Sequence, residues 1–98
     1  NTTEMGPNVR RLFIHRMSVL AIPAGGGFAD GLAFFTDQDK RRRIMHEAEM
    51  WVAGAIQTVR TASAPNPWRE ADDETIAGEI MRQVEERKND ASRSRSSN

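Results

Sequence analysis

The sequence contains no cysteine, which excludes disulfide bonds, zinc sites built on thiolates and cysteine nucleophiles. Small secreted domains often depend on disulfides, so their absence favours a reducing compartment, and we expect a cytoplasmic protein. There are only two histidines, His15 and His46, which are too few for a conventional histidine-rich metal site. We therefore expect no metal and no other cofactor.

The sequence also has no excess of charge of either sign. Fourteen basic and fourteen acidic residues give a formal net charge of zero, so bulk charge favours neither nucleic acid nor an acidic ligand. Hydrophobic residues make up 38% of the 98 residues, below the roughly 45–50% of typical domains. A chain of this size forms one small domain with a small core, and part of its surface is expected to need a partner.

No long hydrophobic run is present. The nearest stretch, from Met17 to Phe35, is interrupted by Pro23, three glycines and Asp30, so we predict no membrane-spanning segment. Two adjacent arginines, Arg10 and Arg11, precede an apolar stretch as in an export signal, but no convincing small-residue cleavage site follows. We expect neither export nor membrane association.

An apolar segment near the N-terminus, residues 12–22, has two readings. Its spacing predicts one face of a helix, formed by Phe13, Ile14, Met17, Leu20 and Ala21. Asn8 would cap this helix and Pro23 would end it. The alternative is a strand over residues 18–22, because Val19 and Ile22 are β-branched. We favour the helix.

Residues 24–31 contain three consecutive glycines and predict a break, and residues 32–35 form a short apolar patch. Thr36 is a suitable N-cap for the helix that follows, with Asp39 reaching back to it. The helix itself, about residues 37–61, has apolar side chains at three- and four-residue spacing. Gly54, inside this run, marks either a close helix crossing or a tolerated glycine.

Residues 63–68 form a turn, since Pro65 and Pro67 end the long helix. Asp72 or Asp73 then caps a shorter helix over about residues 73–87. We therefore predict an all-α fold: a helical hairpin of 37–61 with 73–87, on which the N-terminal apolar segment packs. The alternative is an α+β fold with a short N-terminal strand or hairpin. Residues 1–8 are expected to be flexible, 9–88 to form one helical domain, and 89–98 to be a disordered Ser/Arg tail.

The long helix carries an apolar face that we expect to be wider than the rest of the chain can cover. The shorter helix offers only a narrow apolar stripe in return. We predict that the exposed remainder is an interface in a homo-oligomer or with a protein partner, with Trp51 and Ile56 near its centre. The predicted interface residues are Ile44, Ala48, Trp51, Val52, Ala55, Ile56, Val59 and Trp68.

The basic run Lys40, Arg41, Arg42 and Arg43 is the most distinctive polar feature. Four cations in the first turns of a helix oppose its dipole, and this unfavourable placement favours a role in phosphate binding. Nucleic acid is therefore the alternative partner, with the N-terminal arginines assisting. The competing interpretation is an ordinary solvated surface.

No catalytic motif is present. His46 and Glu47 begin like a zinc-protease helix, but Met50 occupies the position of the second histidine. The acids of residues 70–74 are explained by a helix start, and an enzyme would need a site built on them or on His46. We expect a small non-enzymatic interaction or assembly module, an accessory protein of prokaryotic, phage or mobile-element type.

Overall fold

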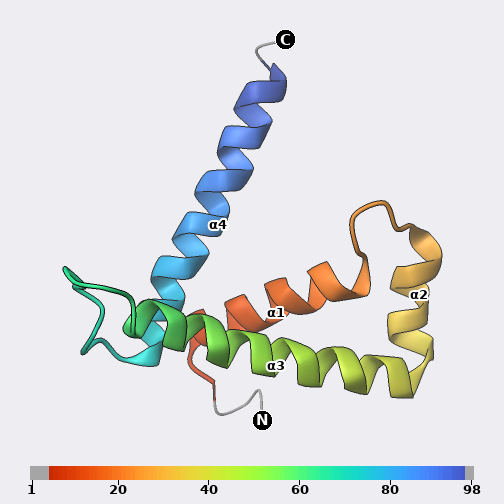
Figure 1. Cartoon of the computed structure of the whole chain (residues 1–98). Coiled ribbons are helices and arrows are strands. Elements are labelled where there is room, and N and C mark those ends of the chain that lie inside the picture. The colour runs from red at the N-terminus through yellow and green to blue at the C-terminus, as the bar shows by residue number, and fades with distance from the viewer. Residues whose placement is uncertain (1–4, 97–98) are drawn as a thin grey trace.

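The computed structural model describes residues 5–96, with side chains to Ala91, and the regular structure of these residues is helical throughout. The helices are α1 (Pro7–Ala21), α2 (Phe28–Thr36), α3 (Gln38–Arg60) and α4 (Asp73–Ser96). In Figure 1, α1 and α3 run side by side in opposite directions, α2 turns the chain between them at one end, and α4 leaves the other end steeply. The all-α prediction is confirmed, and the described residues contain no strand that would support the α+β alternative.

The N-terminus of α1 is capped from a distant part of the chain. Gly6 is the N-cap residue and Pro7 the first helical residue, a position that suits proline because its fixed φ is already helical. The carboxylate of Glu74, in the first turn of α4, accepts hydrogen bonds from the backbone N–H groups of Asn8 (2.9 Å) and Val9 (2.8 Å). The prediction that Asn8 caps this helix is thus wrong by two residues, because a carboxylate from α4 takes the capping role.

Two glycines permit this close approach of α1 and α4. A side chain at Gly6 would overlap the carboxylate of Glu74, and a Cβ at Gly78 would lie 2.9 Å from the amide nitrogen of Asn8. Residues 5–8 therefore belong to the packed structure, which corrects their assignment to a flexible segment, while residues 1–4 lie outside the described part. Gly54 has open space around it, so it does not mark a helix crossing.

Helix α1 lies between α3 and α4, and its buried side faces both. Leu12 and Phe13 are fully buried, whereas Ile14 is 52% exposed. The predicted apolar face is therefore displaced by one position, because contact with two helices centres the buried side on Leu12 and Phe13. The helix ends before Pro23, with the N–H of Ile22 donating to the carbonyl of Ser18. The strand alternative for residues 18–22 is wrong.

Helix α2 was not predicted. Gly25 adopts a positive φ of 85°, which turns the chain after α1, and Gly27 then caps α2 while its N–H donates to the Asp30 carboxylate (3.2 Å). The break that we predicted over residues 24–31 thus ends at Gly27 in the structure. At the other end, Thr36 is the last residue of α2, and its hydroxyl donates to the carbonyl of Leu32.

Asp37, not Thr36, caps α3, since its carboxylate accepts from the N–H of Lys40 (3.1 Å). The buried residues of α3 are spaced four apart: Ile44, Ala48, Val52 and Ile56. Ala48, Val52 and Ile56 join a core to which α1 and α4 contribute Leu12, Phe13, Ile76, Ala77 and Met81. The centre of the apolar face of α3 is therefore covered within the single copy, whereas Trp51, Ala55 and Val59 at its edge are only partly buried.

The connection between α3 and α4 is held by side chains at both ends. The amide nitrogen of Asn66 donates to the carbonyls of Val59, Arg60 and Ala62, which satisfies the last turn of α3. Asp72 caps α4 by accepting from the N–H of Thr75 (2.8 Å), as predicted, and hydrogen bonding from the side chain and the backbone of Thr75 lowers the pKa of Asp72.

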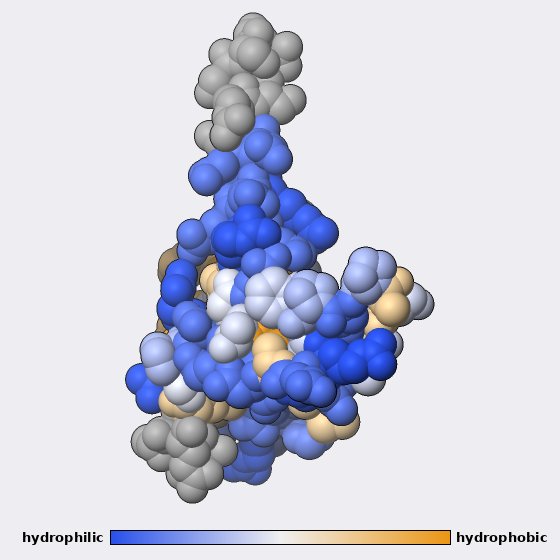
Figure 2. Space-filling view, turned by 90° about the vertical axis from the view of Figure 1, so that its left-hand side faces the viewer, coloured by the Kyte–Doolittle hydropathy of each residue, from blue (hydrophilic) through white to orange (hydrophobic). Residues whose placement is uncertain are grey.

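Helix α4 continues to Ser96, nine residues past its predicted end at 87, and residues 97 and 98 of the predicted tail lie outside the described part. Its C-terminal half projects from the other helices (Figure 1), and the part of it that Figure 2 colours is hydrophilic on the face shown. Both α3 and α4 have their larger contacts with α1. The antiparallel alignment expected of a helical hairpin is not confirmed.

Candidate interaction surfaces

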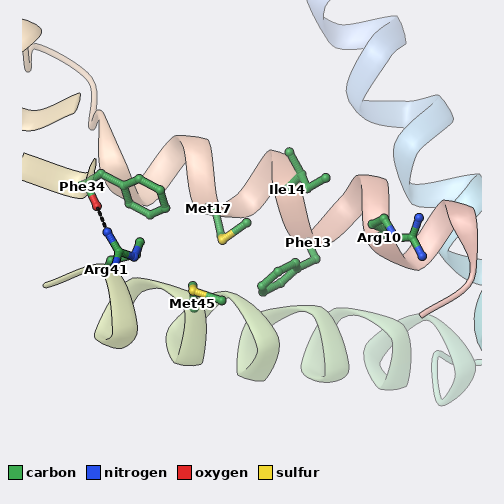
Figure 3. A pocket seen from close by; sticks show the side chains of 7 residues that line it. All are labelled: Arg10, Phe13, Ile14, Met17, Phe34, Arg41 and Met45. Atoms are coloured by element: carbon green, nitrogen blue, oxygen red, sulfur yellow. Dashed lines mark hydrogen bonds between the residues drawn. The ribbon is translucent and has the colours of Figure 1, made fainter. Parts of the chain in front are cut away.

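An open apolar trough lies between α1 and α3 and is closed at one end by α2 (Figure 3). Its volume is about 560 Å³. A second depression of about 220 Å³ continues it between α1 and α2 and shares three lining residues with it, Ile14, Met17 and Phe34. We refer to both together as the α1–α2 trough, which is lined by Arg10, Phe13, Ile14, Met17, Ser18, Ala21, Ile22, Gly31, Phe34, Phe35, Arg41 and Met45.

The charged residues that line the α1–α2 trough are both arginines, and each is fixed by backbone carbonyls. The guanidinium of Arg41 donates to the carbonyls of Phe35 (3.0 Å) and Phe34 (3.5 Å), so it caps the C-terminus of α2. Arg10 donates to the carbonyl of Met5 (3.3 Å). The trough therefore has an apolar floor and a positively charged rim.

Helix α2 places an apolar stripe beside the trough. Phe28, Leu32 and Phe35 follow the i, i+4, i+7 spacing of one helix face and are 84%, 50% and 74% exposed. Phe35 is held edge-on to Phe34, with ring centroids 5.3 Å apart. None of the residues of α2 is fully buried. This is the α2 stripe, which sequence reasoning missed, although the spacing of the three residues was available to find it.

The eight predicted interface residues fall into three groups. Ile44, Ala48, Val52 and Ile56 are buried in the core of one copy, so they are not available on its surface. Trp68 packs half-buried against this core. The remaining three are Trp51, Ala55 and Val59, and they line a separate groove.

This separate groove lies where α1, α3 and α4 meet, and we call it the Trp51 groove. Its volume is about 400 Å³, and it shares no lining residue with the α1–α2 trough. Its lining residues are His15, Arg16, Trp51, Ala55, Thr58, Val59, Ile80, Gln83, Val84 and Arg87. The Arg16 guanidinium lies over the Trp51 ring, 4.6 Å from its centroid.

The predicted phosphate-binding residues are mostly engaged within the chain. Lys40 pairs with Asp30 and Arg42 with Asp39, each at 4.0 Å, while Arg41 caps α2 and Arg43 is exposed. Arg11 and Arg16 do not join this group, since Arg11 pairs with Glu85 (3.0 Å) and Arg16 covers Trp51. Of the three N-terminal arginines, Arg10 alone lines the same trough as Arg41, and it does so at the opposite end (Figure 3).

The described part of the chain contains no cluster of three metal-ligating side chains, and His46 is exposed. None of its helices is long and apolar enough to cross a membrane.

Comparison with known proteins finds no match: neither a protein-family model, nor a curated protein, nor a solved structure is similar to this chain.

Proposed function

We propose that this protein is a small assembly module that self-associates through the α2 stripe and the α1–α2 trough. The observation that carries the proposal is the exposure of Phe28, Leu32 and Phe35 on one helix face, directly beside an open apolar trough. Burying a large apolar side chain stabilises by about 1.5–3 kcal/mol, so three such residues offer enough free energy to support association. We propose this surface in place of the predicted interface on the long helix, because much of that helix face is buried in the core of the single copy.

A second copy of the chain is the occupant that we propose for this surface. Trough and stripe lie next to each other, so a two-fold axis near α2 would place the stripe of each copy against the trough of the other. Phe28, at the outer end of the stripe, is the least covered large apolar residue and would act as the anchor in the partner's trough.

Charge also favours a second copy. The sequence around the stripe carries three acids, Asp30, Asp37 and Asp39, followed by the four bases of residues 40–43. Because both signs are present and the chain is neutral overall, two identical surfaces meet without strong repulsion, and carboxylates beside one stripe can approach the Arg10 and Arg41 rim of the other copy. The absence of cysteine favours the cytoplasm as the compartment of this assembly.

The proposal is tested by sedimentation equilibrium of the full chain over a wide concentration range. We expect the wild type to form a dimer and the double variant Phe28→Ser/Phe35→Ser to be monomeric, because the stripe is lost. Met50→Ser is the matched control, since Met50 on α3 is 64% exposed and lies outside both trough and stripe. A wild type that stays monomeric at every concentration, or a double variant that still dimerises, would overturn the proposal.

Nucleic-acid binding through Lys40 to Arg43 gains no specific support. Arg41 is held by the carbonyls of α2, and Lys40 and Arg42 each have an acidic neighbour. Binding to phosphates would have to break or share these contacts, whereas Phe28, Leu32 and Phe35 stay exposed among the described residues.

A further inference from the structure

We propose that the Trp51 groove is a binding site for an amphiphilic organic anion, a carboxylate or phosphate attached to a short apolar chain or ring. The groove is built from three helices at the point where α4 diverges from α3 (Figure 1), and it lies apart from the α1–α2 trough. Its lining combines an apolar wall with cationic side chains, which is the composition that an amphiphilic anion requires.

The cationic part of the groove is held in place before a ligand arrives. The Arg16 guanidinium rests on the Trp51 ring, and this cation–π contact orients its planar fork. The Nε atom of Arg16 is buried and has no hydrogen-bond partner among the described residues. A buried donor left unpaired is costly, and a small rotation of the guanidinium toward a ligand oxygen would remove that cost.

His15 gives a second, independent indication. Its Nδ1 atom is also buried without a hydrogen-bond partner among the described residues. Burial, together with the positive charges of Lys88 and Arg16, lowers the pKa of His15. Cations from α1 and α4 thus converge here, and an anion between them would reduce their mutual repulsion.

The charge around the site is one-sided. Arg16 and Arg87 line the groove, Lys88 lies close enough to act on His15, and none of the described lining residues is acidic. Neighbouring acids of α4 are engaged elsewhere: Glu79 and Glu86 pair with Arg82, and Glu85 pairs with Arg11. The side chains that line the groove are therefore positive on balance, which favours an anionic head group.

The apolar wall selects against a bare inorganic anion. Ala55, Val59, Ile80 and Val84 form it together with the part of Trp51 that Arg16 leaves free. A ligand whose apolar body packs on this wall while its head group reaches Arg16 uses both halves of the groove, and the volume of about 400 Å³ suits a small organic molecule.

The experiment is an NMR titration of the wild-type chain with octanoate, octyl phosphate, octanol and inorganic phosphate, following the two indole N–H signals. We expect both amphiphilic anions to shift the Trp51 signal at low concentration and to leave the Trp68 signal in place. Octanol and inorganic phosphate, each of which has only one of the two required parts, should bind at least tenfold more weakly. Which of the two amphiphilic anions binds more tightly identifies the preferred head group.

The variant Arg16→Gln should lose at least tenfold in affinity for octanoate, because hydrogen bonds to charged groups are the stronger ones. Arg42→Gln is the matched control, since Arg42 is exposed and lies outside the groove, and it should bind as the wild type does. Equal binding of octanol and octanoate, an unchanged affinity of Arg16→Gln, or equal shifts of both indole signals would overturn the proposal. These outcomes are independent of self-association, which sedimentation of the same samples reports.

Discussion

Replacing Glu74 by alanine tests the long-range cap that joins the start of α1 to the start of α4. The Glu74 carboxylate accepts from the N–H groups of Asn8 and Val9, 66 and 65 residues away, at 2.9 and 2.8 Å. Glu74→Ala leaves both groups without this partner at the N-terminus of α1, where the helix dipole also favours a negative charge. Because α1 fills the space between α3 and α4, weakening its start should destabilise the whole fold.

The magnitude follows from the two hydrogen bonds. Losing an N-cap costs about 1 kcal/mol in typical cases and up to about 2 kcal/mol. Hydrogen bonds to a charged acceptor lie at the upper end, about 1.5–3 kcal/mol. Since the site is only partly buried, we expect a loss of about 2 kcal/mol, which for a domain of this size lowers Tm by roughly 8–16 °C.

Thermal unfolding followed by circular dichroism measures this effect. Glu85→Ala is the control, because Glu85 also lies on α4 and also contacts α1, but through an exposed ion pair with Arg11. Exposed pairs contribute about 0–1 kcal/mol, so Glu85→Ala should shift Tm only slightly. If both variants unfold at the same temperature, the carboxylate of Glu74 is not the cap of α1 and the reasoning fails.

Three further predictions concern stability. Gly54→Ala should stabilise by about 1 kcal/mol, because the site is open and alanine is the better helix former, whereas Gly78→Ala should lose most of that gain by displacing Asn8; urea unfolding of both variants checks this. The pKa of His15 is lowered, so the unfolded chain binds a proton at this residue more readily than the folded chain does. His15 therefore contributes stability above pH 6.5 that is lost as pH falls. In His15→Gln the midpoint of urea unfolding should depend less on pH over that range. Hydrogen bonds from Arg82 and Gln83 lower the pKa of Glu79 from 4.5 to about 2, so its contribution is present above pH 4.5 and disappears between pH 4.5 and about 2, and Glu79→Gln should remove this acid dependence.

Two features that local chemistry sets could be predicted from the sequence, the body of α3 and the start of α4. The body of α3 follows from apolar residues spaced four apart, and the start of α4 follows from an aspartate that accepts from the N–H of Thr75. The start of α1 could not be found in this way, because its capping group lies 66 residues further along the chain. Helix α2 was missed because the three consecutive glycines indicated a break, although apolar residues with helical spacing begin directly after them.

The candidate sites depended on packing, which a single sequence does not define. The sequence correctly showed that Ile44, Val52 and Ile56 form one apolar face, but not which helix covers it. Because α1 covers the centre of that face, the exposed apolar stripe that we propose as an interface lies on α2 instead. Trp51 stays at the edge of the core, where Arg16 covers its ring. That contact joins two helices and has no signature in the spacing of either residue.

Disulfide cross-linking of single-cysteine variants tests the account most directly, because the chain has no cysteine of its own. Leu32 lies in the middle of the α2 stripe and the exposed Ser18 lines the α1–α2 trough, so the proposed two-fold assembly places Leu32 of one copy against the trough of the other. We predict that an equimolar mixture of Leu32→Cys and Ser18→Cys forms a disulfide-linked heterodimer under mild oxidation, while a mixture of Leu32→Cys and Met50→Cys, whose cysteine on α3 is also exposed, does not. Cross-linking of Leu32→Cys to Met50→Cys with none to Ser18→Cys would contradict the claim that this protein assembles through α2.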